Sequence, residues 1–430
     1  MALVVQKFGG SSVADPESIR RVAKRIVDTR RAGNDVAVVV SAMGDTTDEL
    51  IDLAAAVTDR EPSAREMDVL LTAGERISMA LLAMAVSDLG VTAHAYTGQQ
   101  AGLLTDSVYG NASIVGVVPE RIARVIAHGD VAIIAGFQGV NRATNDVTTL
   151  GRGGSDTTAV AFAAALHADV CEIYSDVDGV FTADPRIVPK AHKLSALTYE
   201  ETLEMAAHGA KILHLRAVEY ARRYGVPLHV RSSFSTKEGT WIVDETTRKQ
   251  MEAKLEGRNE APIISGVSHD NSQAKITVVG VPDVAGSAAK LFAAVAGAGV
   301  NIDVIVQNVP VDNPGAANIS FTTKIADVPT AVAALEAEQE EIGFAKVLRN
   351  DGVGILSLVG AGMRTNPGVS AKLFEALSDA GVSIDLISTS EIRISVAVKS
   401  AQLDDAVRAV HTAFGLDTDG EAIVYGGTGR

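Results

Sequence analysis

The chain has 430 residues, of which 47% are hydrophobic and 21% are charged, so it can form packed cores and is not a largely disordered protein. At about 100–200 residues per domain, this length predicts two to four domains. Acidic residues outnumber basic residues by 53 to 38, giving a net charge of −15, and aromatic residues make up only 4%. Nucleic acids and anionic membranes are therefore poor candidates for partners, although a local basic pocket could still hold a nucleotide.

The cellular setting is constrained by cysteine content and by the first residues. Cys171 is the only cysteine, which excludes an intrachain disulfide and a cysteine-based zinc site. Residues Met1–Gly10 lack a basic segment followed by an apolar core, and no apolar run reaches the roughly 18 residues that a membrane span needs. We therefore expect a cytoplasmic protein with no membrane partner.

Strand and helix signals alternate over the first 240 or so residues. The apolar runs Ala2–Gln6, Val36–Val40 and Val131–Phe137 are typical of central parallel strands covered on both faces. Between the first two runs, Asp15 followed by proline predicts a helix start, and Gly33 predicts its end. The pattern predicts an α/β domain with helices on both sides of a mainly parallel sheet.

After a charged connector at Glu245–Glu260, the chain contains an internal repeat. Gly286–Ile305 and Gly368–Ile387 are identical at 12 of 20 positions. Each copy predicts a β-α-β-β-α-β order over about 80 residues, which is the ferredoxin-like arrangement. The opening strands are expected at Lys275–Val281 and Val353–Gly360, and the helices after them at Gly286–Ala298 and Val369–Ala380.

The matched glycines of the repeat lie at the first strand-to-helix turn of each copy. Free N–H groups at the start of a helix can bind a carboxylate, so a site for a small anionic effector is plausible there. Duplication for stability alone is the alternative interpretation, and we consider it less favoured.

Two glycine-rich loops are candidates for phosphate or carboxylate binding. Lys7–Ser12 follows the first predicted strand and combines a cation, two glycines and two hydroxyls. It matches neither the Walker A loop nor the G-x-G-x-x-G fingerprint, so a tight structural turn remains the alternative. Thr148–Thr158 contains three glycines, Arg152 and Asp156 just before a buried helix predicted at Ala159–Leu166, and this pattern is typical of an anion cradle.

Three further segments carry weaker signals. Tyr174–Arg186 follows a strand predicted at Val170–Tyr174, and its acidic residues lack the full calcium-loop pattern, so they are equally interpretable as turn residues. Thr72–Arg76 alone reads as a helix start, and Ser41–Gly44 as a loop after a buried strand. The sequence has no G-x-S-x-G nucleophile elbow and no H-x-x-x-H or H-E-x-x-H metal motif.

Taken together and in order, seven segments resemble the aspartate kinases of the amino-acid kinase superfamily, and the repeat resembles their paired ACT regulatory domains. The segments are KFGGSS from Lys7, SAMG from Ser41, TAGE from Thr72, GFQG from Gly136, TLGRGGSD from Thr149, YSDVDGVFTADPR from Tyr174 and KILH from Lys211. The resemblance covers essentially the whole chain and is nearest to the shorter, actinobacterial type. It implies a three-layer α/β/α kinase domain at 1–245, a linker at 246–262 and two ferredoxin-like ACT modules at 263–350 and 351–430.

The resemblance also implies phosphorylation of the β-carboxylate of L-aspartate by ATP with Mg²⁺, giving 4-phospho-L-aspartate, the first step toward lysine, threonine, methionine and diaminopimelate. By the same resemblance, Lys7 stabilises the transferring phosphoryl group and Asp156 orients Lys7. Arg152 would hold the substrate α-carboxylate, and Glu75 its ammonium group. Further substrate contacts are implied for Ser41, Thr47, Gly153, Gly154 and Ser155. Nucleotide contacts are implied for Lys7, Phe8, Gly9, Gly10, Ser155, Tyr174, Ser175, Asp176, Val180, Phe181, Asp184, Pro185, Arg186 and Lys211.

Regulation and assembly are implied in the same way. Lysine and threonine are the expected effectors of the ACT pair, and the enzyme is expected to be a homo-oligomer or a heterotetramer with a short regulatory chain that starts internally, with Met251 as the candidate start. The implied effector contacts are Asp283, Gly286, Asn301, Ile302, Gln307, Asn308, Asn366, Pro367, Gly368, Val369, Ser383, Ile384, Thr389 and Glu391. The two turns differ in sequence, PDVAGS against TNPGVS, which permits different ligands.

Two other functions stay open. One is another amino-acid kinase, acting on glutamate or acetylglutamate, although such kinases generally lack tandem ACT modules. The other is a non-catalytic amino-acid sensor built on an inactive kinase fold. The presence of Lys7, Glu75, Arg152 and Asp156 argues against the sensor.

Overall fold

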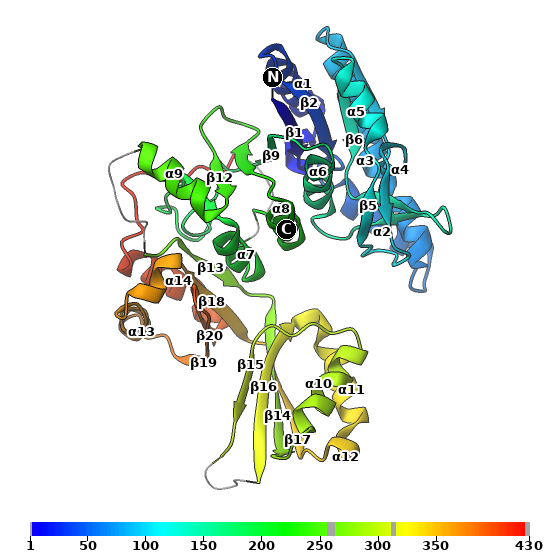
Figure 1. Cartoon of the computed structure of the whole chain (residues 1–430). Helices are drawn as coiled ribbons and strands as arrows, with labels where there is room; N and C mark the ends of the chain where they lie inside the picture. The colour runs from blue at the N-terminus through cyan, green and yellow to red at the C-terminus, as the bar shows by residue number, and fades with distance from the viewer. Residues whose placement is uncertain (1, 211, 256–262, 311–314, 426–430) are drawn as a thin grey trace. The chain divides into compact units, whose positions relative to one another are not determined.

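The computed structural model describes residues 2–210, 212–255, 263–310 and 315–425 (Figure 1). Its contacts divide the chain into two compact units. The first unit contains residues 1–207, 211–261 and 418–430, and the second contains residues 208–210 and 262–417.

The first unit is organised around an eight-stranded sheet in the order β10-β12-β11-β9-β1-β2-β6-β3. The six strands from β11 to β3 are mutually parallel, whereas β12 is antiparallel to β11. Their bounds are β1 Leu3–Phe8, β2 Asp35–Val40, β3 Ala93–Tyr96, β6 Val131–Ala135, β9 Val170–Ser175, β10 Ala196–Thr198, β11 Leu228–Ser232 and β12 Thr240–Val243. A smaller sheet contains β4 Leu103–Thr105, β5 Ile114–Val117, β7 Gln138–Asn141 and β8 Val147–Thr149.

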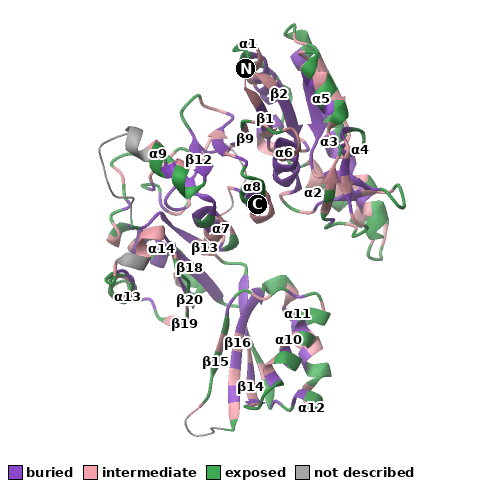
Figure 2. Ribbon diagram, viewed as in Figure 1, coloured by how far each residue is buried: buried purple, intermediate pink, exposed green. Residues whose placement is uncertain are grey.

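Helices cover both faces of the large sheet, so the predicted three-layer α/β/α fold with a mainly parallel sheet is confirmed. Helices α1 and α3 pack on one face, where alternate residues of β1, β2 and β6 are fully buried (Figure 2). Helix α6 packs against β1, β2 and β9 on the opposite face. The helices of this unit are α1 Pro16–Arg31, α2 Thr46–Val57, α3 Ala64–Asp88, α4 Gly98–Ala101, α5 Glu120–Ala127, α6 Gly154–Ala165, α7 Tyr199–Ala207, α8 Leu215–Tyr224 and α9 Glu245–Leu255.

Local signals place the start of α1 as predicted, whereas α6 begins at Gly154 rather than at Ala159, and Thr72–Arg76 lies inside α3 rather than at a helix start. The Asp15 carboxylate accepts a hydrogen bond from the Ser18 N–H at 2.8 Å, and α1 begins at the following proline. Fully buried β2 and β6 match the predicted apolar runs. Helix α6 is buried nearly all round, because it packs between the sheet and α8.

Helix α3 is long and apolar enough to span a membrane by length and composition alone, although Glu75 and Arg76 interrupt its apolar sequence, so it is not the uninterrupted apolar run that the sequence analysis excluded. The same test is also passed by core helices of soluble proteins. Here Leu82 and Val86 of α3 are fully buried in the core against α1 and the sheet, and Asp68 and Glu75 are buried on the same helix. These features identify α3 as a core helix of the first unit.

The second unit contains two four-stranded antiparallel sheets. The first has the order β15-β16-β14-β17 with helices α10 and α11, which is the predicted β-α-β-β-α-β arrangement. The second has the order β13-β18-β20-β19 with helices α13 and α14. The bounds are β13 Gly266–Asp270, β14 Gln273–Pro282, α10 Ser287–Gly297, β15 Ile305–Asn308, β16 Ala316–Lys324, α11 Val328–Ala337, α12 Gln339–Ile342, β17 Lys346–Asn350, β18 Val353–Val359, α13 Val369–Asp379, β19 Ile384–Thr389, β20 Arg393–Lys399 and α14 Leu403–Ala413.

Three segments lie elsewhere than the ranges 246–262, 263–350 and 351–430 imply. Strand β13 pairs with β18, so the first module is inserted between two strands of the second sheet. Helix α9 belongs to the first unit, where the buried Arg248 pairs with the buried Glu201 carboxylate at 2.6 Å. The segment from Thr418 onward also belongs to the first unit. Each difference depends on a partner distant in sequence, which a repeat alignment does not reveal.

Candidate active site

Four of the candidate loops follow neighbouring parallel strands, so they meet at one edge of the large sheet. The loops after β1, β2, β6 and β9 begin near Phe8, Val40, Ala135 and Ser175. Backbone hydrogen bonds join three of them: Ser41 N–H donates to the Phe8 carbonyl at 3.0 Å, and Gly136 N–H donates to the Val40 carbonyl at 3.0 Å. Ligands of open parallel sheets bind at this edge.

An ion pair between Lys7 and Asp156 lies at this edge of the sheet. The Lys7 ammonium lies 2.6 Å from the Asp156 carboxylate, and the two side chains are 13% and 10% exposed. Strand alternation explains the contact, because Gln6 and Phe8 point to the α1 face while Lys7 points to the α6 face. Asp156 lies in the first turn of α6, where a carboxylate is favoured by the helix dipole. The structure thus brings together the two glycine-rich loops that the sequence singled out.

Two glycines allow backbone to line this space. A Cβ on Gly10 would lie 3.0 Å from the Gly44 carbonyl and 3.1 Å from the Ala42 carbonyl, so a side chain there would press on the second loop, which glycine lets approach closely. Gly153, at the start of α6, has a φ of +69°, and its Cβ would lie 2.1 Å from the His214 ring. The N–H groups of both turns can therefore come close to an anion.

Glu75 on α3 is a buried carboxylate adjacent to the Ser41–Gly44 loop. Its Oε1 accepts a hydrogen bond from the Ala42 N–H at 3.2 Å, and burial raises the pKa of this carboxyl to about 7. Its Oε2 is buried and has no hydrogen-bond partner among the described residues. A buried carboxylate with a free oxygen is suited to a ligand cation such as an ammonium group.

The other predicted substrate residues lie around the same edge. Arg152 is exposed before the first turn of α6, and its guanidinium has no hydrogen-bond or ion-pair partner within the described parts of the chain. Gly154 and Ser155 are buried in the first turn of α6, and Thr47 is half-buried in the first turn of α2. Arg152 is therefore the freest of the predicted substrate contacts.

Asp68 is a site residue that the sequence analysis missed. It lies on α3 seven residues before Glu75, hence on the same helix face, and is fully buried. Its carboxylate accepts hydrogen bonds from the Thr149 N–H at 2.9 Å, the Thr149 hydroxyl at 2.7 Å and the Gly110 N–H at 3.0 Å. It therefore anchors the strand that leads into Gly151–Asp156. The sequence signal that could have identified Asp68 was an acidic residue two helical turns before Glu75.

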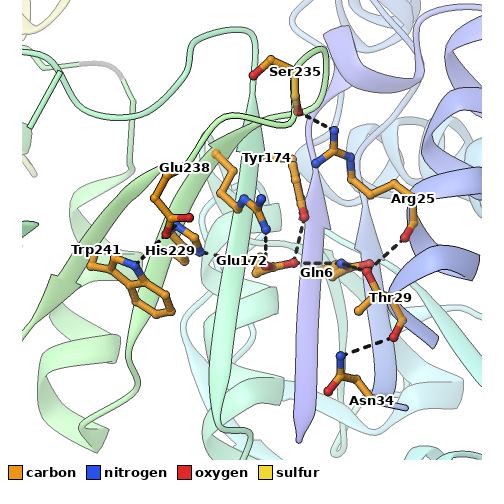
Figure 3. Close-up of polar contacts among 11 residues, drawn as sticks. Gln6, Arg25, Thr29, Asn34, Glu172, Tyr174, His229, Ser235, Glu238 and Trp241 are labelled. Atoms are coloured by element: carbon orange, nitrogen blue, oxygen red, sulfur yellow. Dashed lines mark hydrogen bonds and ion pairs between the residues drawn. The ribbon is translucent and has the colours of Figure 1, made fainter. Parts of the chain in front are cut away.

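A polar network lies below the loops on the α1 face, around Glu172 (Figure 3). The Glu172 carboxylate accepts hydrogen bonds from Gln6 Nε2 at 2.8 Å, from the Tyr174 hydroxyl at 2.8 Å and from Arg231 Nη1 at 2.9 Å. The Tyr174 ring stacks on Phe8 with centroids 4.6 Å apart. The sequence analysis missed Gln6, Glu172 and Arg231, whose side chains join the neighbouring strands β1, β9 and β11.

The loop after β9 is also ordered by its own charges. Asp176 pairs with Arg186 at 3.1 Å, and Asp184 accepts a hydrogen bond from the Arg186 N–H at 2.9 Å. Ser175 donates to Asp176. Other residues predicted to frame a nucleotide are buried, so their side chains support the loops from within: they are Phe8, Tyr174, Val180, Phe181 and Pro185. Lys211 lies outside the described residues.

In the second unit, the predicted effector residues fall at two corresponding helix starts and on β15 and β19. Gly286 precedes α10 with a φ of +99°, and Gly368 precedes α13 with a φ of −82°. Ser383 and Ile384 line a cavity of about 540 Å³, where Lys275 pairs with Asp385 at 2.6 Å. Most of the predicted effector residues are exposed within this single chain.

Comparisons with known proteins agree with this architecture. The amino acid kinase family profile matches residues 2–232, and the ACT domain profile matches residues 276–339 and 356–414. An aspartokinase of Mycolicibacterium smegmatis is 60% identical over 430 residues, covering all of both chains. The crystal structure of aspartate kinase from Synechocystis is 42% identical, with a TM-score of 0.53 over 96% of this chain and 70% of that chain.

Escherichia coli aspartokinase III, crystallised with aspartate and ADP, has a TM-score of 0.83 over 96% of this chain and 99% of its own. At 23% identity, this likeness shows the shared fold. The family profile spans more than half of the chain, and the mycobacterial relative matches it from end to end. The chain therefore belongs to the amino acid kinase family and, within it, to the aspartokinases.

Proposed function

We propose that this edge of the sheet transfers the γ-phosphoryl group of ATP to the β-carboxylate of L-aspartate, giving 4-phospho-L-aspartate and ADP. The observation that carries the proposal is the Lys7–Asp156 pair beside glycine-walled loops. A carboxylate is already a nucleophile at neutral pH, so the reaction requires alignment and charge neutralisation and no general base. Lys7 and the nearby backbone N–H groups supply that neutralisation.

The proposed substrate contacts use opposite charges. Glu75 binds the ammonium group of aspartate through its free Oε2, and Arg152 binds the α-carboxylate bidentately. With both charged ends held, the β-carboxylate is the group left to attack phosphorus. One of its oxygens forms the new P–O bond as the bond from the γ-phosphorus to the bridging oxygen breaks and ADP leaves.

The expected Mg²⁺ fits this residue set as a companion of the nucleotide. Within the described ranges, no group of three or more His, Cys, Asp or Glu side chains is placed to hold a metal ion. Mg²⁺ commonly binds through one or two carboxylates together with substrate phosphates and water, and Asp156 beside Lys7 would be one such carboxylate. When bound, the ion would neutralise charge on the β- and γ-phosphates.

A hydroxamate assay tests the reaction. The protein is incubated with Mg-ATP, hydroxylamine and either aspartate or glutamate, and the acyl phosphate is trapped as its hydroxamate. Product from aspartate alone supports the proposal, product from glutamate supports another amino-acid kinase, and no product supports the sensor. Lys7→Ala is the negative control, and Lys24→Ala, at an exposed position on α1, is the matched control that should stay active.

We further propose that lysine, threonine or both inhibit the enzyme at the ACT modules, and that the enzyme works in the cytoplasm on the route to lysine, threonine, methionine and diaminopimelate. The glycine turns before α10 and α13 support an amino-acid site because their N–H groups can donate hydrogen bonds to a carboxylate. Titration of the activity with lysine and threonine, singly and together, tests this regulation.

A short regulatory chain starting at Met251 is compatible with the pairing of strands in the second unit. Such a chain would still contain β13, the strand that completes the second sheet beside β18. It would lose the Arg248–Glu201 pair, which belongs to the first unit. We therefore propose a homo-oligomer or a heterotetramer containing that chain. Mass spectrometry of the purified complex after Met251→Leu tests whether the start is used.

A further inference from the structure

The segment after α14 returns to the first unit and runs along the loop that follows β9. The Thr418 N–H donates to the Lys190 carbonyl at 2.9 Å, and the Ala422 N–H donates to the Pro189 carbonyl at 2.9 Å. Val424 forms an antiparallel bridge with Val177, and the adjacent Tyr425 N–H donates to the Asp176 carbonyl at 2.9 Å. Thr418–Tyr425, which we name the C-terminal strap, is thus paired by backbone with both ends of this loop.

Tyr425 fixes the strap through its side chain as well. Its hydroxyl donates to Asp178 Oδ2 at 3.3 Å, and its ring stacks parallel to Phe234 with centroids 6.0 Å apart. Asp178 is only 5% exposed and also accepts from the Ser235 hydroxyl at 2.6 Å and from Lys237 Nζ at 2.9 Å. One buried carboxylate therefore joins the strap, the loop after β9 and the loop after β11.

The held residues adjoin the charged part of the proposed nucleotide site. Asp176, whose carbonyl receives the Tyr425 N–H, uses its carboxylate to pair with Arg186. The backbone of Asp176 and Val177 is therefore paired with the strap, and the side chain of the same Asp176 forms the ion pair with Arg186. Loops with few hydrogen bonds open easily, so removal of these bonds should loosen Asp176 and Arg186 first.

We propose that the C-terminal strap positions the loop Asp176–Arg186 for nucleotide binding, with Tyr425 as its principal positioning residue. This inference rests on the proposed function, because it takes that loop as part of the ATP site. The strap follows α14 after only the four residues 414–417, so the last helix of the second ACT module is directly continuous with an element of the nucleotide site. The expected consequence is a selective effect on ATP.

The test uses Tyr425→Phe, Tyr425→Ala and a chain that ends at Asp417, each as the full oligomer. We expect KM for ATP to rise about threefold for Tyr425→Phe and about tenfold or more for the other two, while KM for aspartate changes less than twofold. Tyr224→Ala, at an exposed tyrosine on α8 whose ring lies tilted against that of Tyr220, is the matched control and should leave both constants unchanged.

Two further measurements test the role of the strap independently of the kinetics with aspartate. Binding of ADP is measured by calorimetry without aspartate. This measurement tests the role of the strap in nucleotide binding even if the protein does not phosphorylate aspartate. Hydrogen exchange of the peptide that covers residues 175–187 should be faster in Tyr425→Ala, even if the shortened chain does not fold. Unchanged ADP affinity and unchanged hydrogen exchange in a stably folded Tyr425→Ala would overturn the proposed positioning role of the strap. Hydroxamate formation that depends on aspartate would still support the proposed function in that case.

Discussion

The two ends of the candidate active site are built differently. At the phosphate end, Lys7 and Asp156 are already paired in a largely buried position, and glycine backbone lines the space beside them. At the substrate end, Glu75 is buried and fixed, but Arg152 is exposed and has no partner within the described residues. The proposed phosphate end is therefore preorganised, whereas the proposed substrate end still contains a side chain without a partner. Preorganised groups lower the barrier, and adaptable groups govern affinity.

The largest expected effect is at the preorganised end. We expect Lys7→Ala to lower kcat by about a thousandfold, because it removes the cation that we propose to face the transferring phosphoryl group. KM for aspartate should change much less, since Lys7 does not contact the proposed aspartate groups. Steady-state kinetics check this division, with Lys24→Ala as control. A Lys7→Ala enzyme whose kcat falls less than tenfold would refute the assignment.

At the adaptable end, the expected effect is on affinity. Arg152→Ala should raise KM for aspartate by about 10-fold to 100-fold, the usual range for losing charge-assisted hydrogen bonds. Because the guanidinium has no partner within the described structure, the free energy of unfolding should be unchanged. Arg142→Ala, another exposed arginine of the first unit, is the matched control. Unaltered aspartate affinity in Arg152→Ala would contradict the proposed contact.

The pH dependence of aspartate use should follow Glu75. Its pKa is raised from 4.5 to about 7 by burial, so between these values the folded chain holds a proton that the unfolded chain has released. The contribution of this group to the free energy of unfolding therefore decreases as pH rises from about 4.5 to about 7. Ionised Glu75 is the form that binds ammonium, so kcat/KM for aspartate should fall up to about tenfold per pH unit below 7.

The control for this titration is Glu75→Gln, which should have lower kcat/KM for aspartate and should lack the acidic limb near pH 7. Stability is followed by thermal melts of both proteins over the same pH range. An acidic limb that persists in Glu75→Gln would assign the titration to a different group.

The two ends of the site also differ from their supporting residues in how far the sequence predicts them. Lys7 and the glycines after it were predictable because they lie at the carboxyl end of an apolar strand, and parallel strands bring these ends to one edge. Asp156 was predictable because it lies beside glycines at the start of a buried helix. Asp68 and Glu172 were not predicted, because their roles depend on partners 81 and 166 residues away in sequence. The same reason applies to β13, whose partner β18 follows the whole inserted module. Local pattern predicts elements, whereas long-range pairing decides which elements complete a site.

The smallest expected effect on kinetics is for Asp68, the buried residue of α3 that anchors the strand leading into Gly151–Asp156. Asp68→Asn places an amide where three donors converge on a buried carboxylate, and we expect a loss of about 1–3 kcal/mol in the free energy of unfolding. Because Thr149 leads into Gly151–Asp156, a looser anchor should raise KM for aspartate about threefold with little change in kcat. Arg65→Ala, one turn earlier on α3 with an exposed ion pair to Asp146, is the matched control and should be nearly neutral. Equal effects of the two substitutions on KM would mean that Asp68 stabilises the fold without positioning the substrate loop.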